Sequence, residues 1–189
     1  MADTSYQPKV YREQGGARQV IASGGSLDVE SGGDLDIESG GALKLAGTQV
    51  YPTVTAEVLF TEAGAAGTYT GTIALPAGSR IIDIGVTGLV LWTAGTVAKM
   101  IVGDGDDPDG FFLETNLKAT DLLVGETNNI EHPGGLAGTY IASEQRVLYA
   151  DAARNIIGVV TTTGTAATAG RTRMYVCYAT AIAGAAVKS

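Results

Sequence analysis

An eight-residue repeat near the start of the chain constrains the fold more than any other feature. Its three units follow one another without a gap and read SGGSLDVE, SGGDLDIE and SGGALKLA over residues 23–46. The Gly-Gly pair of each unit suits a tight turn, because glycine adopts positive φ at little steric cost. The residues that follow alternate between apolar and polar, as in a β-strand with one buried face. The repeat therefore predicts short strands separated by tight turns.

Each unit supplies two large apolar side chains, which are too few to stabilise a single copy by itself. Repeat units of this kind bury their apolar faces against neighbouring surfaces. Those surfaces come either from the same chain, as a plain meander packed on its own domain, or from other copies. We favour three copies intertwined around one axis. The predicted trimer interface consists of the apolar pairs Leu27 and Val29, Leu35 and Ile37, and Leu43 and Leu45.

The repeat divides the chain of 189 residues into three parts. Residues 1–13 form a polar arm that we expect to be extended, and residues 14–50 contain the repeat stem. Residues 51–189 hold β-patterned segments divided by turn residues, a pattern that indicates a β-sandwich or a barrel. We expect a jelly-roll-like sandwich. The expected fold class is all-β, with one short helical turn at 116–124. The candidate strands span 56–60, 68–75, 81–91, 96–102, 145–150, 155–163 and 173–181.

Composition excludes several classes of function. The chain has 12 Lys and Arg against 20 Asp and Glu, whereas a protein that coats nucleic acid needs a basic surface to displace counterions. Its one Cys and one His cannot build a disulfide framework or a Cys/His zinc site. The most apolar stretch, 81–102, contains Asp83 and Lys99, so it predicts buried strands and not a membrane helix. We expect no nucleic-acid partner, no membrane partner, no cofactor and no enzymatic activity.

Four carboxylates cluster in one turn, at Asp104, Asp106, Asp107 and Asp109. Counted from Asp104, an EF-hand loop needs an oxygen ligand at the fifth position and glycine at the sixth. Here the fifth residue is Pro108 and the sixth is Asp109. We therefore expect a solvated turn, with an irregular Ca²⁺ site as the alternative.

Three single residues have simple structural interpretations. His132 precedes Pro-Gly-Gly, which predicts a loop residue and not a catalytic base. Cys177 lies in a strongly β-patterned segment and is expected to be a buried strand residue. Trp92 is expected in the sandwich core.

Recognisable motifs also occur in two segments outside the repeat, one before it and one after it. The first is Tyr6-x-Pro8-x-Val10-Tyr11-Arg12-x-Gln-Gly-Gly, which leads into the SGG units, and the second is LPAG, LWTAGT and VGD within 75–104. With these motifs nearly the whole chain resembles the head decoration (cement) and head-fibre proteins of tailed bacteriophages. The resemblance implies a homotrimeric virion structural protein on the outer capsid surface. Its partner would be the major capsid protein, and it would decorate and stabilise the head.

The arm is the expected capsid anchor, because Tyr and Arg are enriched among the energetic hot spots of interfaces. The predicted capsid-binding residues are Tyr6, Pro8, Val10, Tyr11 and Arg12. The alternative function is a carbohydrate-binding or host-receptor-binding β-module of a phage fibre, with the aspartate turn as an optional Ca²⁺ site. Fold alone does not separate these two functions.

Overall fold

The computed structural model describes residues 10–12, 19–21, 26–31, 33, 43–45, 48–50, 53–118, 120–142, 147–165 and 167–180. The chain divides into two compact units, residues 1–41 and 42–189. In chain order the elements are β1 (Val10–Arg12), β2 (Gln19–Ile21), β3 (Leu43–Leu45), β4 (Thr48–Val50), β5 (Thr53–Thr61), β6 (Gly67–Leu75), β7 (Ser79–Val90), β8 (Val97–Gly103), β9 (Phe112–Asn116), β10 (Thr127–Asn129), α1 (Thr139–Ala142), β11 (Tyr149–Ala150), β12 (Arg154–Thr163) and β13 (Arg171–Thr180). Among the described residues, no helix has the length and hydropathy needed to cross a membrane.

Among the described residues of the first unit, β1 and β2 form a small antiparallel pair in which Val10 is opposite Ile21. The first full repeat unit differs from the sequence prediction, because residues 26–30 form no strand in the single chain. Leu27 is 59% exposed and Val29 is 47% exposed. A turn follows, in which Gly33 N donates to Glu30 O at 2.9 Å. The expected alternation between a buried and an exposed face is therefore absent here, since all of residues 26–30 are exposed.

The third repeat unit does contain the predicted strand. Its Leu43–Leu45 segment is β3, which pairs with β4 so that Leu43 is opposite Val50. Leu35 and Ile37 of the second unit lie outside the described residues.

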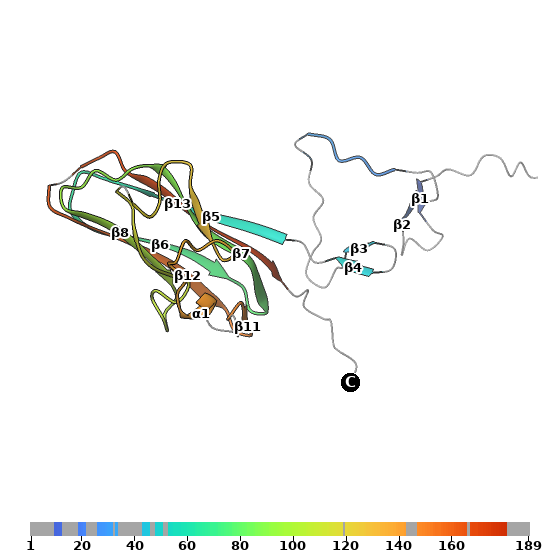
Figure 1. Ribbon diagram of the computed structural model, residues 1–189. Coiled ribbons are helices and arrows are strands. Elements are labelled where there is room, and N and C mark those ends of the chain that lie inside the picture. Colours follow the sequence, from blue (N-terminus) through green and yellow to red (C-terminus); the bar gives the residue numbers. More distant parts are fainter. Residues whose placement is uncertain are drawn as a thin grey trace, which may run out of the picture. The chain divides into compact units, whose positions relative to one another are not determined.

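The second unit is dominated by a sandwich of two antiparallel sheets (Figure 1). One sheet has the strand order β10-β7-β13-β5, with β11 also paired to β7, and the other has the order β6-β12-β8-β9. The chain stays in one sheet only from β8 to β9 and from β10 to β11, and every other step from β5 to β13 crosses to the other sheet. This architecture confirms the predicted all-β sandwich.

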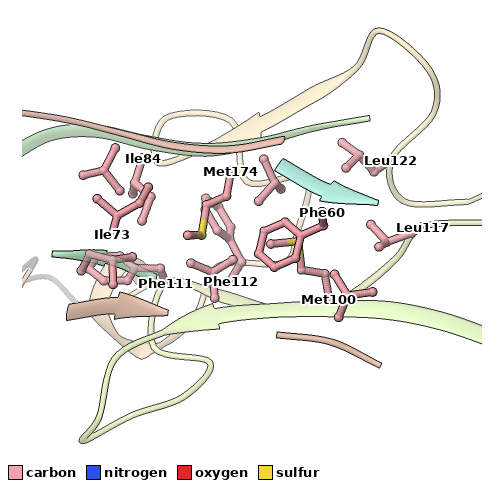
Figure 2. Packing of buried hydrophobic residues seen from close by; sticks show 14 of the residues in the cluster. Phe60, Ile73, Ile84, Met100, Phe111, Phe112, Leu117, Leu122 and Met174 are labelled. Carbon is pink, nitrogen blue, oxygen red and sulfur yellow. The ribbon is translucent and has the colours of Figure 1, made fainter. Parts of the chain in front are cut away.

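The core lies between the two sheets because each strand directs alternate side chains inward. On β13, Met174 and Val176 are fully buried while Tyr175 between them is half-buried on the outer face. Figure 2 shows Phe60 of β5 and Met174 of β13 from one sheet meeting Met100 of β8 from the other. The fully buried side chains of largest volume are Trp92, Phe111, Phe112, Ile81, Ile84, Met100, Leu117, Leu122, Ile156, Met174, Val86 and Val102.

Several local predictions need correction. No helical turn forms among the described residues of 116–124, and α1 lies instead at Thr139–Ala142. The strand expected at 145–150 is described only as the two-residue β11. Strands β9 and β10 were not predicted, since FLETN and TNN lack a clear period-two pattern. Both owe their strand conformation to the neighbours they pair with, β8 and β7.

One inward-facing glycine allows a particularly close approach between the two sheets. A Cβ atom on Gly71 of β6 would lie 2.4 Å from Val58 Cγ1 and 2.7 Å from Phe60 Cζ, both on β5. These distances are well below van der Waals contact, and a valine methyl on a rigid strand cannot move far. Glycine at this position therefore determines how tightly β5 packs over β6.

We expect Gly71→Ala to lower the free energy of unfolding by about 1–3 kcal/mol, the usual cost of overpacking a core. The matched control is Gly105→Ala, where the new Cβ meets nothing within 4 Å, and the expected change is within about 0.5 kcal/mol. Urea denaturation of both variants provides the measurement. Equal stabilities of the two variants would contradict the tight packing of Gly71.

Candidate functional site

The predicted capsid-binding residues fall partly within the described structure. Tyr6 and Pro8 lie outside the described residues, whereas Val10, Tyr11 and Arg12 form β1. Among the predicted trimer-interface residues, Leu27 and Val29 are exposed, and Leu43 and Leu45 lie on β3. The arm and the stem residues thus remain predictions about binding.

The aspartate turn holds a buried carboxylate in place of the expected solvated one. Asp104, directly after β8, is only 7% exposed. Its Oδ1 accepts hydrogen bonds from the backbone N of Asp106 at 3.0 Å and of Asp107 at 2.9 Å. These bonds close an Asx-type turn, which is the local reason that the chain reverses here.

Distant parts of the chain complete this turn. Tyr140 of α1 donates its hydroxyl to Asp104 Oδ1 at 3.0 Å, and Arg154 at the start of β12 donates Nε to Oδ2 at 2.8 Å. Arg154 Nη2 also lies 2.8 Å from Oδ2. The guanidinium carbon lies 5.0 Å from the ring centroids of both Phe111 and Tyr140, which is the geometry of a cation–π contact. We call Asp104, Arg154, Tyr140 and Phe111 the Asp104 cluster.

The charge states within the cluster follow from these contacts. Burial by itself raises the pKa of Asp104, but the hydrogen bonds from the Asp107 and Asp106 backbone, the Tyr140 hydroxyl and the Arg154 charge outweigh it and lower the pKa below 3.8. Burial and the Asp104 hydrogen bond raise the pKa of Tyr140 to about 12. At neutral pH the cluster therefore contains a carboxylate, a guanidinium and a neutral phenol.

The four aspartates of the turn do not converge on a common point. Asp104 is directed toward Arg154, and the Asp107 carboxylate accepts a hydrogen bond from the Thr139 hydroxyl. Within the part of the chain that the structure describes, no three His, Cys, Asp or Glu side chains are grouped so as to hold a metal ion. The irregular Ca²⁺ site in this turn therefore stays a prediction.

A second buried carboxylate lies near the opposite end of β8, where sequence reasoning missed it. Glu62, just after β5, is 3% exposed. Its oxygens accept hydrogen bonds from Thr93 N at 3.0 Å, Thr93 Oγ1 at 3.1 Å, Ala94 N at 2.8 Å and Gly170 N at 3.0 Å. Burial raises the pKa of Glu62, but these hydrogen bonds outweigh it and keep the pKa below 4.5.

Trp92 precedes the residues that contact Glu62. Its side chain is 2% exposed, which confirms its expected position in the core. Its indole Nε1 donates to Thr172 Oγ1 at 2.9 Å, and its ring meets Tyr69 edge-on at a centroid distance of 5.3 Å. Gly170 passes directly against the indole, since a Cβ there would lie 2.5 Å from the ring. The three chain segments around Glu62 are thus fixed by both polar and apolar contacts.

The prediction for His132 is confirmed, whereas the prediction for Cys177 is only partly correct. His132 lies in a loop as predicted, and its backbone N donates to Asn129 O at 3.2 Å and to Asn129 Oδ1 at 2.8 Å. Cys177 does lie on a strand, β13, but the prediction of burial is wrong, because it is half-buried on the face turned away from the core.

Two adjoining cavities of about 280 and 240 Å³ border the Asp104 cluster. Asp104 and Arg154 line both, but the Asp104 oxygens already accept four hydrogen bonds from protein donors. Glu62 likewise accepts four. Carboxylates held in this way fix loops in place and are poorly suited to transfer protons or bind a ligand.

No family model matches the chain, and no curated protein matches it. Chains from three solved structures are similar to it. One comes from the acidic stable capsid structure of Helicobacter pylori bacteriophage KHP30, with 16% identity, a TM-score of 0.43 and coverage of 69% of this chain and 90% of that chain. One comes from the capsid asymmetric unit of cyanophage Pam1, with 18% identity, a TM-score of 0.44 and coverage of 75% and 95%. One comes from the capsid of Ralstonia phage GP4, with 19% identity, a TM-score of 0.42 and coverage of 70% and 85%. At these TM-scores the likeness carries no argument about function.

We expect Asp104→Asn to lower the free energy of unfolding at pH 7 by about 3 kcal/mol, because it leaves the buried Arg154 charge without its counterion. The folded-state pKa of Asp104 lies below its unfolded value of 3.8. The contribution of the carboxylate is therefore present above about pH 4 and is lost as the pH falls through the folded pKa. Asp104→Asn should consequently show a weaker loss of stability in acid than the unaltered protein.

Asp106→Asn is the matched control, because the Asp106 side chain is exposed and only its backbone N contacts Asp104. Thermal or urea unfolding between pH 2 and pH 7 measures both variants. A stability difference between the two variants that does not shrink in acid would rule out the ion pair as its source.

Proposed function

We propose that this chain is a structural protein of a tailed-bacteriophage virion, which binds the outer capsid surface as a homotrimer and decorates and stabilises the head. The observation that carries the proposal is the repeat unit at residues 26–30. Its apolar pair, Leu27 and Val29, is 59% and 47% exposed in the single chain. A repeated apolar pair in this position requires another surface, and further copies of the same repeat supply it.

The arm that precedes the repeat supports the same function. Its Tyr and Arg residues are of the types that dominate interface energies, and a trimer presents three arms at once. Binding of the first arm raises the effective concentration of the other two near their sites, so that modest individual affinities combine into firm attachment. The major capsid protein is the partner that the sequence resemblance implies.

The sandwich suits a permanent structural role. Its two buried carboxylates are fully engaged in holding loops, and its core is closely packed. The three structurally similar chains also come from phage capsids, although likeness at their TM-scores adds no weight of its own.

The stem is tested by replacing Leu27→Asp and Val29→Asp together. Charges on the apolar pair oppose its burial, so we expect light scattering to show a trimer for the unaltered chain and a monomer for the variant. Ser26→Asp with Ser31→Asp is the matched control, since it adds the same charges at exposed polar positions and should leave the trimer intact. A monomeric unaltered chain, or a trimeric Leu27/Val29 variant, contradicts the stem.

The arm is tested by deleting residues 1–13 and measuring co-sedimentation with capsids of the phage that lack this protein. We expect the truncated protein to remain a folded trimer and to lose capsid binding. Full-length protein with Tyr6→Ala and Arg12→Ala should bind at least about tenfold more weakly, the effect of one lost hot spot or more. Undiminished capsid binding by the truncated trimer would contradict the proposal that the arm is the capsid anchor.

A further inference from the structure

Each sheet of the sandwich ends in an edge strand on either flank, and the two flanks differ in how far these edge strands are covered. On one flank, β9 is covered by the segment that precedes α1. Leu113 N donates to Leu136 O and Gly138 N donates to Phe111 O, both at 2.9 Å, and Phe112 forms a bridge with Ala137. The other edge strand there, β10, has only three residues. Short edges and covering segments are the usual protection against pairing with other chains.

The opposite flank is formed by β5 and β6, which we call the β5–β6 flank. Both strands have nine residues, both lie at the edge of their sheets, and they contact each other. Within the described ranges, no strand pairs with the outer edge of either one. About half of the backbone N–H and C=O groups in an edge strand point away from the sheet, so both strands have backbone groups free to pair.

The side chains of this flank do not provide the usual protection either. Strand β6 reads GTYTGTIAL and has neither a charge nor a proline, and β5 has a single charge, at Glu57. Arg173 on the neighbouring β13 lies 3.6 Å from that carboxylate. Val54 is 40% exposed and Leu59 is 49% exposed. The pairings of β5 with β13 and of β6 with β12 run without a register shift, so no bulge twists the edges away.

We propose that the β5–β6 flank binds a second copy of this chain, with β5 of one copy against β6 of the next. The inference rests on the trimer of the proposed function. Only residues 51 and 52 separate β4, at the end of the stem, from the start of β5. Stems that associate therefore bring the β5 strands of the copies within about 10 Å of the stem ends.

Electrostatics and symmetry favour a second copy as the occupant of this flank. The whole chain has a net charge of −8, but the flank has one carboxylate with an arginine beside it, so two flanks meet without strong repulsion. A contact between two different surfaces, such as β5 with β6, is heterologous and closes into a ring under three-fold rotation. The flank thereby extends the stem interface onto the sandwich.

The experiment is hydrogen–deuterium exchange on the full-length protein, read on peptides that cover β5 and β6, together with light scattering over a dilution series. In the unaltered protein we expect both strands to be protected along their whole length in the trimer. The variant Val54→Lys with Thr70→Lys places a lysine at an exposed position on each strand, and lysine on an edge opposes strand pairing. We expect it to lose that protection and to dissociate at a concentration at least about tenfold higher.

Val124→Lys is the control, because Val124 is 59% exposed in the loop between β9 and β10 and should leave both measurements unchanged. A trimer in which the outer-edge amides of β5 and β6 exchange rapidly overturns the flank inference and leaves the proposed function standing. Protection that arises only on capsids also overturns it, because the occupant would then be the capsid. A monomeric unaltered chain overturns both, and protection of the edges in that monomer would identify another part of the same chain as the occupant.

Discussion

The sandwich depends on two buried carboxylates that act at the two ends of β8. Glu62 holds the segment before β8 to the ends of β5 and β13, and Asp104 holds the turn after β8 to α1 and β12. The Glu62 connection links strands of both sheets, whereas the Asp104 connection ties two strands of one sheet, β8 and β12, to α1. Because each carboxylate accepts four hydrogen bonds, the cost of burying its charge is offset locally. The apolar core between these two points can then pack closely, with glycines such as Gly71 where the sheets approach.

Much of the β-sandwich could be predicted from the sequence, because the relevant signals are local. Runs of β-branched residues with period two specified β7, β8, β12 and β13, and Gly- or Asp-rich turns marked their ends. The roles of Glu62 and Asp104 could not be predicted in this way. The donors to Glu62 lie 31 to 108 residues away in the sequence, and Arg154 lies 50 residues from Asp104. A carboxylate in a Gly- and Asp-rich turn has the same local sequence whether solvent or a distant arginine faces it.

In the repeat, by contrast, the sequence signal is clear but does not by itself produce a strand. Its period is unmistakable, yet residues 26–30 form no strand in one chain, whereas β3 forms where β4 is available to pair with it. Whether such a short unit forms a strand depends more on a neighbouring strand to pair with than on the β-propensity of its own residues. The exposed β5 and β6 edges follow the same rule on the sandwich, where a strand has formed and its outer side still lacks a described partner.

The register of β13 with β5 also determines where the chain enters and leaves the sandwich. Thr53 is opposite Ala179, so the connections to the preceding stem and to the last residues leave from one corner, while Thr61 and Arg171 meet at the far end. A peptide fused after Thr180 would therefore emerge beside the stem junction. One inserted in the 164–170 turn would emerge at the opposite end of this strand pair, where β5 ends and β13 begins. For displaying a foreign sequence away from the stem junction, the internal turn is the suitable attachment point.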